Sequence, residues 1–365
     1  MIEGVYIHVP FCSLKCPYCD FTSFVSFDEE LYKHYVDTLL KELLMYREKN
    51  FSVKTIYFGG GTPSLLPPSL IYRVLDFIFK NFKTESELEI TLEVNPNSYS
   101  KKEFKSIKQI GINRLSFGSQ SLIEKNLRAL GRDHKPTDTV RSVYGAVESG
   151  IENINLDFIY GVPNQSLKEI EEDLKLYTAL PITHISAYML TAYDETPLGV
   201  VVKKGYIELP DEEESYKMFK VVDQFLEDRG FKRYEISNWA KDGYECRHNI
   251  SYWKHLEFLG VGVSAWSFIG YERFGNTKNI NQYLEAVNRG EKAVILREFL
   301  DEEKIREERV FLGLRLREGI ELNLIRNLEF LKEIVSRDYV KVENNRLTLS
   351  HKGIMVLNYI ASRLI

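Results

Sequence analysis

Three cysteines lie within eight residues of one another, at Cys12, Cys16 and Cys19. Thiolates are the usual ligands of iron–sulfur clusters, and four per cluster is the usual count. Only three are present locally, so one iron of a 4Fe–4S cluster would have no protein ligand and would be open to a small molecule. Zinc is the alternative, with His8 as a fourth ligand, although structural zinc sites usually pair two short Cys/His knuckles.

Strands and helices alternate over the first half of the chain and must position this cysteine segment. The strand patterns are short, apolar and rich in β-branched residues, whereas the helical patterns repeat apolar residues every three to four positions. Strands are predicted over residues 5–9, 53–58, 88–94, 114–118, 153–159 and 184–190, and helices over residues 29–48, 70–82, 102–110, 137–150 and 166–180. Successive strand–helix units predict parallel strands with helices packed outside them.

The predicted fold class is α/β, with a partial (β/α)6 barrel. A full (β/α)8 barrel needs two more units than the sequence shows, and a doubly wound open sheet is the alternative. In α/β barrels the site forms at the carboxyl ends of the strands. The cysteines follow the first predicted strand, Gly59–Gly61 follow the second and Gln120 follows the fourth, while Glu93 ends the third and Asp157 lies near the end of the fifth. These residues are therefore expected to share one site.

The pattern changes after residue 190. Residues 201–300 are predicted as an α+β extension, with a helix over 211–229 and a strand over 231–236, and they contain all three tryptophans. Residues 301–365 begin with a charged helix, continue with a hairpin over 339–349 and resemble a small winged-helix domain. The predicted domains are therefore 1–200, 201–300 and 301–365, packed into one body because no low-complexity linker separates them.

Composition narrows the class of function. The chain has 365 residues, of which 44% are hydrophobic, and a formal net charge of −5. Binding of nucleic acid or anionic lipid through bulk charge is therefore not expected. The chain does not start with a basic segment followed by an apolar stretch. Its longest apolar runs, such as residues 258–266, are far shorter than the ~20 residues of a membrane-spanning helix, so a cytoplasmic protein is expected.

The motif Cys12-x3-Cys16-x2-Cys19, with Tyr18 before the last cysteine, resembles the radical S-adenosylmethionine (SAM) superfamily. In that superfamily the open iron chelates the amino and carboxylate groups of SAM. The resemblance extends along nearly the whole chain to the coproporphyrinogen dehydrogenase-like branch, HemN and HemW. Five segments carry it in order: Tyr6–Cys12, Gly59–Pro63, Glu93–Pro96, Asn113–Ser121 and Asp157–Pro163.

The resemblance implies a 4Fe–4S cluster on the three cysteines and a SAM site beside it. Gly59, Gly60 and Gly61 would let the backbone approach the methionine end of SAM, and Glu93 would accept the ribose hydroxyls. By motif, the SAM contacts also include Tyr6, Tyr18, Thr62, Gln120, Arg132 and Asp157. A surface salt bridge is the alternative role for Arg132, and a place in the core is the alternative for the two tyrosines.

A second motif begins at His248 and reads His-Asn-Ile-Ser-Tyr-Trp. It resembles the His-Asn-x-x-Tyr-Trp motif of the HemW-type haem chaperones. Imidazole is a good axial ligand for haem iron, and aromatic rings nearby can cover a porphyrin. The resemblance makes His248 a candidate haem ligand, and a hydrogen-bonded structural histidine is the alternative. Cys246 is either a second iron ligand or a buried, inert thiol.

One position separates the two branches. The coproporphyrinogen dehydrogenases have an additional cysteine two residues after the third, where this chain has Phe21, and they have a longer N-terminal extension. The expected function is therefore that of a haem chaperone, which binds haem as cargo and transfers it to acceptor haemoproteins. The alternatives are an oxygen-independent coproporphyrinogen III oxidase-type radical SAM enzyme and a haem-degrading radical SAM methyltransferase. Whether the protein is an enzyme stays open.

Partners are also implied by the resemblance alone. Respiratory enzymes are expected among the haem acceptors, which implies a transient contact with membrane proteins. A homodimer is also implied, although no surface patch for it can be identified in the sequence.

Overall fold

Six parallel strands form the centre of the fold, and each overlaps its predicted range. The computed structural model describes residues 1–365. It places β1 (Ile2–Val9), β4 (Phe51–Gly60), β5 (Thr84–Val94), β6 (Arg114–Gln120), β7 (Asn153–Tyr160) and β8 (His184–Met189) side by side in this order. The cysteine segment follows β1 and contains two short paired strands, β2 (Phe11–Cys12) and β3 (Phe24–Val25).

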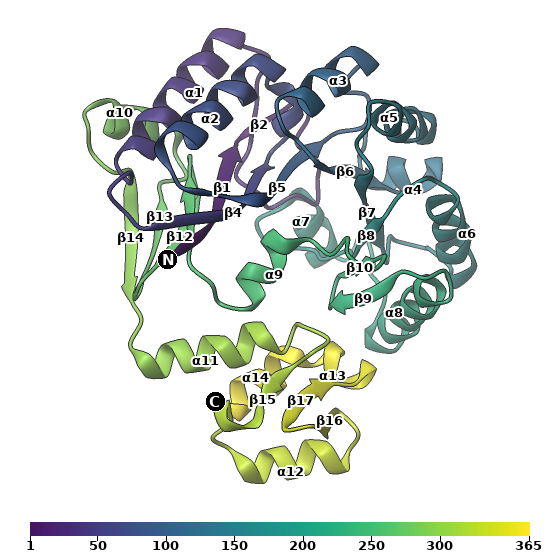
Figure 1. Cartoon of the computed structure of the whole chain (residues 1–365). Helices are drawn as coiled ribbons and strands as arrows, with labels where there is room; N and C mark the ends of the chain where they lie inside the picture. The colour runs from purple at the N-terminus through teal and green to yellow at the C-terminus, as the bar shows by residue number, and fades with distance from the viewer.

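Helices cover the outer face of these strands (Figure 1). Fully buried side chains such as Ile56, Leu92 and Leu115 belong to the main apolar core between strands and helices. Ser100 and Ser166 start their helices with reciprocal capping boxes, which satisfy amide donors that would otherwise have no partner. The helices on this face are α1 (Glu29–Leu44), α2 (Pro68–Asn81), α3 (Lys101–Gln109), α4 (Glu124–Ala129), α5 (Pro136–Glu148) and α6 (Leu167–Thr178). The next helix, α7 (Pro197–Lys203), lies against the cysteine segment instead.

Additional strands extend both edges of the sheet. β11 (Phe258–Val261) pairs in parallel with β1 and adds a seventh parallel strand that the sequence pattern did not predict. The antiparallel strands β12 (Trp266–Ile269), β13 (Glu272–Asn276) and β14 (Val294–Phe299) follow it. At the other edge β10 (Asn238–Ala240) and β9 (Lys232–Glu235) continue from β8. The sheet ends at β14 and β9 without closing, which confirms the partial barrel.

Residues 201–300 therefore contribute strands to the barrel sheet itself, together with α8 (Glu212–Glu227), α9 (Arg247–Trp253) and α10 (Ile280–Asn288). Residues 310–364 have a separate apolar core of 12 buried residues. This part contains α11 (Glu302–Gly313), β15 (Ile320–Glu321), α12 (Leu328–Ser336), β16 (Val340–Glu343), β17 (Arg346–Leu349), α13 (His351–Met355) and α14 (Leu357–Leu364). The three-stranded sheet β15-β17-β16 among these helices fits the predicted winged-helix-like domain. The division at residues 200 and 300 stays a prediction.

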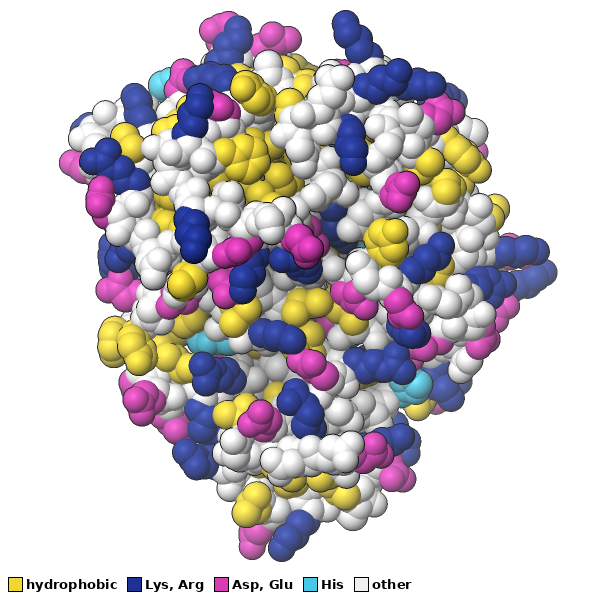
Figure 2. All heavy atoms as spheres, viewed as in Figure 1, with side chains coloured by type: hydrophobic (Ala, Val, Ile, Leu, Met, Phe, Trp, Pro, Cys, Tyr) yellow, Lys and Arg dark blue, Asp and Glu magenta, His cyan; other side chains and the backbone are white.

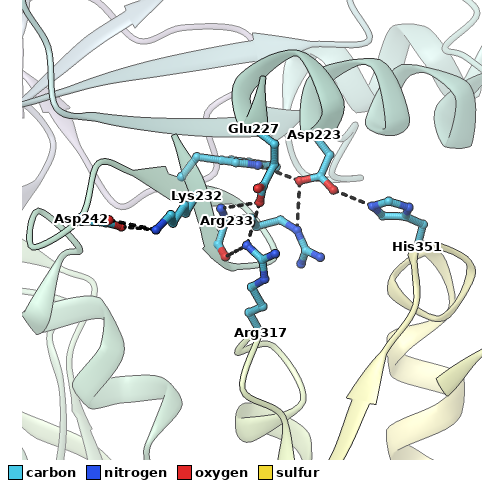
Figure 3. A network of polar contacts seen from close by, with 8 residues as sticks. Asp223, Glu227, Lys232, Arg233, Asp242, Arg317 and His351 are labelled. Carbon is cyan, nitrogen blue, oxygen red and sulfur yellow. Dashed lines mark hydrogen bonds and ion pairs between the residues drawn. The ribbon is translucent and has the colours of Figure 1, made fainter. Parts of the chain in front are cut away.

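A polar network joins this C-terminal part to α8 (Figure 3). Asp223 accepts from Trp239 Nε1 at 2.8 Å and from Arg233 Nε at 3.1 Å, while its second oxygen contacts His351 at the start of α13. Ile354, on the same short helix, belongs to the main apolar core of the barrel. Polar and apolar contacts therefore both fix the C-terminal part against the barrel.

No helix combines the length and apolar character that a membrane span requires. Basic and acidic side chains are intermixed over the face of the molecule shown in Figure 2, where hydrophobic side chains are exposed only in small groups.

Candidate functional site

The cysteine segment lies at the carboxyl end of β1, beside the end of β4. Cys16 is buried, whereas Cys12 and Cys19 are partly exposed, and all three are free thiols. Pro17 holds the segment in place, since its carbonyl accepts from Leu198 N at 2.9 Å. The thiols do not converge on one point as the ligands of a single metal ion do. A 4Fe–4S cluster instead attaches each thiolate to a different iron.

A chain of hydrogen bonds connects two of these cysteines across the strand ends. Thr62 Oγ1 donates to Cys12 Sγ at 3.7 Å and accepts from Asn95 Nδ2 at 3.2 Å. Arg132 donates from Nη2 to Asn95 Oδ1 at 2.9 Å and from Nη1 to Cys16 Sγ at 3.5 Å. Thiolate sulfur is the usual ligand of iron–sulfur clusters, and hydrogen-bond donors to the sulfur atoms are a usual part of such sites, so this donor set fits an iron–sulfur cluster.

Arg132 is therefore not in a surface salt bridge. Besides Asn95 and Cys16, it donates to the Gly118 carbonyl at 2.9 Å. The side chain thus spans the ends of β5 and β6 and the cysteine segment. Gly131, directly before it, has a φ of +66° and lies against Pro17 with no room for a Cβ atom.

The three consecutive glycines allow a close approach of backbone to side chains. A Cβ on Gly59 would lie 3.1 Å from Glu93 Oε1, and one on Gly60 would lie 2.5 Å from the His8 ring. Gly60 also has a φ of +112°, in the region that favours glycine. A Cβ on Gly61 would lie 2.6 Å from the Phe11 carbonyl. Any side chain here would close the space between β1, β4 and the cysteine segment.

Glu93 and Asp157 face each other inside the barrel, near the ends of β5 and β7. Glu93 accepts from the Tyr57 hydroxyl at 2.8 Å and from Gly60 N at 3.1 Å, whereas Asp157 accepts from Asn155 Nδ2 at 2.8 Å. Burial and the neighbouring Asp157 raise the pKa of Glu93 to about 7. Burial also raises the pKa of Asp157 to about 6. Each carboxyl accepts hydroxyl or amine donors best at a pH above its raised pKa, where it is ionised.

The other predicted SAM contacts lie around the same opening. Gln120 ends β6 with a φ of +64°, and Tyr6 on β1 contacts His8 Nδ1 through its hydroxyl at 3.1 Å. Tyr18 packs against the apolar cluster that includes Leu130. The strand ends thus bring the cysteines, the glycines and these polar residues together, as the carboxyl-end rule predicts. Their ligand roles stay predictions.

His248 lies apart from this opening, on α9. This helix lies below the barrel strands, between them and α11 (Figure 1). His248 is 1% exposed, and its imidazole is stacked on Tyr57 of β4. Its Nδ1 is 2.7 Å from Thr55 Oγ1 and its Nε2 is 2.7 Å from the Tyr252 hydroxyl. Burial lowers the pKa of His248 to about 3, so the ring is neutral and both its nitrogens are satisfied.

Glu89, also on β5, holds the first turn of α9. Its carboxylate accepts from Arg247 N and His248 N, both at 3.0 Å. Cys246 Sγ lies 3.7 Å from the same carboxylate and is fully buried. Burial raises the pKa of Cys246 to about 12, which fits the inert thiol rather than a metal ligand.

The C-terminal part contacts the last residue of the motif. The guanidinium of Arg315 lies 4.3 Å from the ring centroid of Trp253, within the range of a cation–π contact. Motif residues thus contact both the barrel interior and the C-terminal part.

A family model for the radical SAM superfamily matches residues 6–177. The heme chaperone HemW of Bacillus subtilis is 33% identical over 98% of this chain and 97% of its own. The heme chaperone HemW of Escherichia coli is 38% identical over 72% of this chain and 69% of its own. The chain belongs to the HemW family of radical SAM proteins.

Membership of the HemW family implies a 4Fe–4S cluster and SAM, because the radical SAM superfamily is defined by them. The solved structure of coproporphyrinogen III oxidase (HemN) from Escherichia coli has a TM-score of 0.86. Its sequence is 21% identical, and the match covers 100% of this chain and 90% of the HemN chain. At this identity the similarity shows the shared fold alone.

The sequence did not identify several residues that build this HemW-family site. Asn95 links Thr62 to Arg132, and Tyr57 links Glu93 to His248. Asn95 lies within a motif segment, so its position was a usable signal. Tyr57 lies two residues before Gly59 on the same strand. Residues two apart on a strand share a face, so the Tyr57 side chain lies on the face where Gly59 contacts Glu93.

Proposed function

We propose that the protein is a haem chaperone that carries a 4Fe–4S cluster and exchangeable SAM and transfers haem to acceptor haemoproteins. The observation that carries this proposal is the full-length similarity to proteins named heme chaperone HemW. Phe21 supports it, because a phenyl ring stands where the dehydrogenases have an additional cysteine. The Phe21 side chain is 63% exposed, so it is not part of the hydrophobic core.

Cys12, Cys16 and Cys19 would hold the cluster, whose open iron chelates the amino and carboxylate groups of SAM. The remaining tasks fall to side chains of the chain itself. Arg132 orients Cys16 and offsets thiolate charge, while Glu93 is placed to accept the ribose hydroxyls. The bare backbone of Gly59–Gly61 leaves room for the methionine end of the ligand.

For haem, His248 is the proposed ligand. Because both its ring nitrogens are hydrogen-bonded, binding iron requires the exchange of one of these bonds. Thr55 belongs to a central strand, whereas Tyr252 lies in the last turn of the short helix α9, so the bond to Tyr252 is the one that we expect to be exchanged. Nε2 is therefore the nitrogen that we expect to bind iron.

An anaerobic haem titration tests this function. The cluster is reconstituted, haemin is added, and the Soret band is followed through gel filtration. A band that persists in the wild type and is lost in His248→Ala supports the proposal. His34→Ala is the control, since this exposed histidine lies on α1, away from the barrel interior.

Two experimental outcomes would overturn parts of the proposed function. Conversion of coproporphyrinogen with consumption of SAM would favour the oxidase-type enzyme over the chaperone. Iron retained by the triple Cys12→Ala, Cys16→Ala, Cys19→Ala variant at the wild-type level would refute the cluster assignment. Cys246→Ala should keep the cluster absorbance.

A further inference from the structure

Tyr57 lies between two sites that are far apart in the sequence. Its hydroxyl donates to Glu93 Oε1 at 2.8 Å. Its ring is stacked on His248, with the centroids 5.1 Å apart and the planes inclined by 22°. Tyr6 lies against both, 6.2 Å from Tyr57 and 6.5 Å from His248. A single side chain therefore separates the proposed SAM contact from the proposed haem ligand.

A ligand in the proposed SAM site would change the hydrogen bonds of Glu93. Its carboxylate has two hydrogen-bond donors, Tyr57 on Oε1 and Gly60 N on Oε2. The hydroxyls of a ribose would compete with Tyr57 for the same oxygens. A weaker bond to Glu93 leaves the phenol ring freer to move.

A movement of Tyr57 would in turn affect His248, on which its ring is stacked. The neutral imidazole is held by two hydroxyls and by the stacked ring of Tyr57. No exposed surface is available to absorb a displacement, since the ring is 1% exposed. A movement of Tyr57 therefore changes the contacts of His248 directly.

We propose that Tyr57 is a positioning residue that transmits SAM binding at Glu93 to His248. The inference rests on the proposed function, because it takes the ribose of SAM to bind Glu93. Release of the Tyr57 ring lowers the cost of exchanging a His248 hydrogen bond for haem iron. SAM therefore raises the affinity for haem, and haem raises the affinity for SAM by the same factor, since linkage between two binding sites is reciprocal.

The first experiment uses the wild-type protein with its oxidised cluster and without haem. Isotope-labelled histidine gives separate ring resonances for the 7 histidines, and His248 is assigned with the His248→Gln variant. Addition of SAM should shift the His248 resonance in the wild type and leave it in place in Tyr57→Phe. Phenylalanine keeps the stacked ring but has no hydroxyl for Glu93.

The second experiment measures both affinities. In the wild type, SAM should tighten haem binding about fivefold, and haem should tighten SAM binding about fivefold. In Tyr57→Phe both factors should fall below about twofold. Haem affinity without SAM should rise about fivefold in that variant, to the level of the SAM-bound wild type, because the ring is already released from Glu93. A merely structural role would weaken haem binding instead.

Tyr99→Phe is the matched control, since Tyr99 is also buried and donates one hydrogen bond, to the Leu66 carbonyl at 3.0 Å. It should behave as the wild type in both experiments. A His248 resonance that SAM does not move, or moves equally in Tyr57→Phe, overturns the inference. If the wild type retains no haem, the haem proposal fails while the resonance still decides this inference. If SAM does not bind, the proposed SAM site and the inference fail together.

Discussion

Arg132 donates to Cys16 Sγ at 3.5 Å, although 116 positions separate the two residues. The same guanidinium also holds Asn95 and the Gly118 carbonyl. A cysteine segment with little regular structure is thus tied to the ends of two central strands. The position of the segment therefore depends on this side chain as well as on β1.

Replacement of Arg132 by Met should loosen the cysteine segment. Loss of hydrogen bonds from a charged donor should lower the free energy of unfolding by about 2 kcal/mol. Iron bound per chain after reconstitution should fall at least about twofold. Denaturant titration and iron analysis check these results. Arg128→Met is the control, because Arg128 is exposed and pairs only with Glu124 on its own helix; equal iron loss in both variants would contradict the role of Arg132.

The affinity for SAM should depend on pH through Glu93. With a pKa of about 7, the ionised fraction of the carboxyl rises about tenfold between pH 6 and pH 8. Because the carboxylate is the better acceptor for ribose hydroxyls, SAM binding measured by calorimetry should strengthen by up to about tenfold over this range. Glu93→Gln should bind more weakly and with a flatter profile. An unchanged profile in that variant would assign the dependence to another group.

The raised pKa of Glu93 should also make the stability of the protein fall as the pH rises, whereas SAM binding should strengthen. The pKa of Glu93 in the folded protein lies above its ordinary value of 4.5, so the folded state binds the proton more tightly. The stabilisation is complete below pH 4.5 and is lost as the pH rises towards 7. Denaturant titrations should show the free energy of unfolding decline less steeply over this interval in Glu93→Gln than in the wild type.

Glu89 should prove necessary for the position of α9. Glu89→Ala leaves the amides of Arg247 and His248 without their acceptor, which should cost about 3 kcal/mol of stability. Cys246 should become more reactive toward thiol reagents as the helix loosens. Glu89→Gln keeps one acceptor oxygen and should have roughly half the effect. Unchanged labelling of Cys246 in Glu89→Ala would show that α9 does not depend on this carboxylate.

Asp223 should anchor the C-terminal part. Its replacement by Ala removes the shared acceptor of Trp239, Arg233 and His351 (Figure 3). Breaking such a buried arrangement should destabilise the protein by about 3–5 kcal/mol. Asp76→Ala is the control, because Asp76 has an exposed partner, Lys80, one turn along α2. Thermal unfolding distinguishes them, and similar melting of the two variants would argue against the anchoring role.

The opening of the barrel could be predicted from the sequence because each of its parts has a local signal. Apolar runs identify the strands, and parallel topology brings their carboxyl ends to one edge. The strand pattern alone therefore predicts that Gly59, Glu93 and Asp157 lie close together. Their places along the strands determine where they lie, even where the predicted strand bounds differ from the observed ones by a few residues.

The links between these parts could not be predicted. Arg132 and Cys16, or Tyr57 and His248, meet only through tertiary packing, and no local pattern encodes such a pair. β11 was missed because four residues give too short a period to recognise. The position of α9 below the barrel depends on Glu89, and no local pattern in the sequence indicates that this carboxylate accepts from Arg247 N and His248 N.

The pairing of β1 with both β4 and β11 has a consequence for biosynthesis. β4 leaves the ribosome soon after β1, but β11 ends only at residue 261 of 365. Until then, the strand that leads into the cysteine segment has one edge of its backbone unpaired, and such an edge can pair with other chains. The strand that leads into the cysteine segment is therefore fully paired only after β11 has been translated.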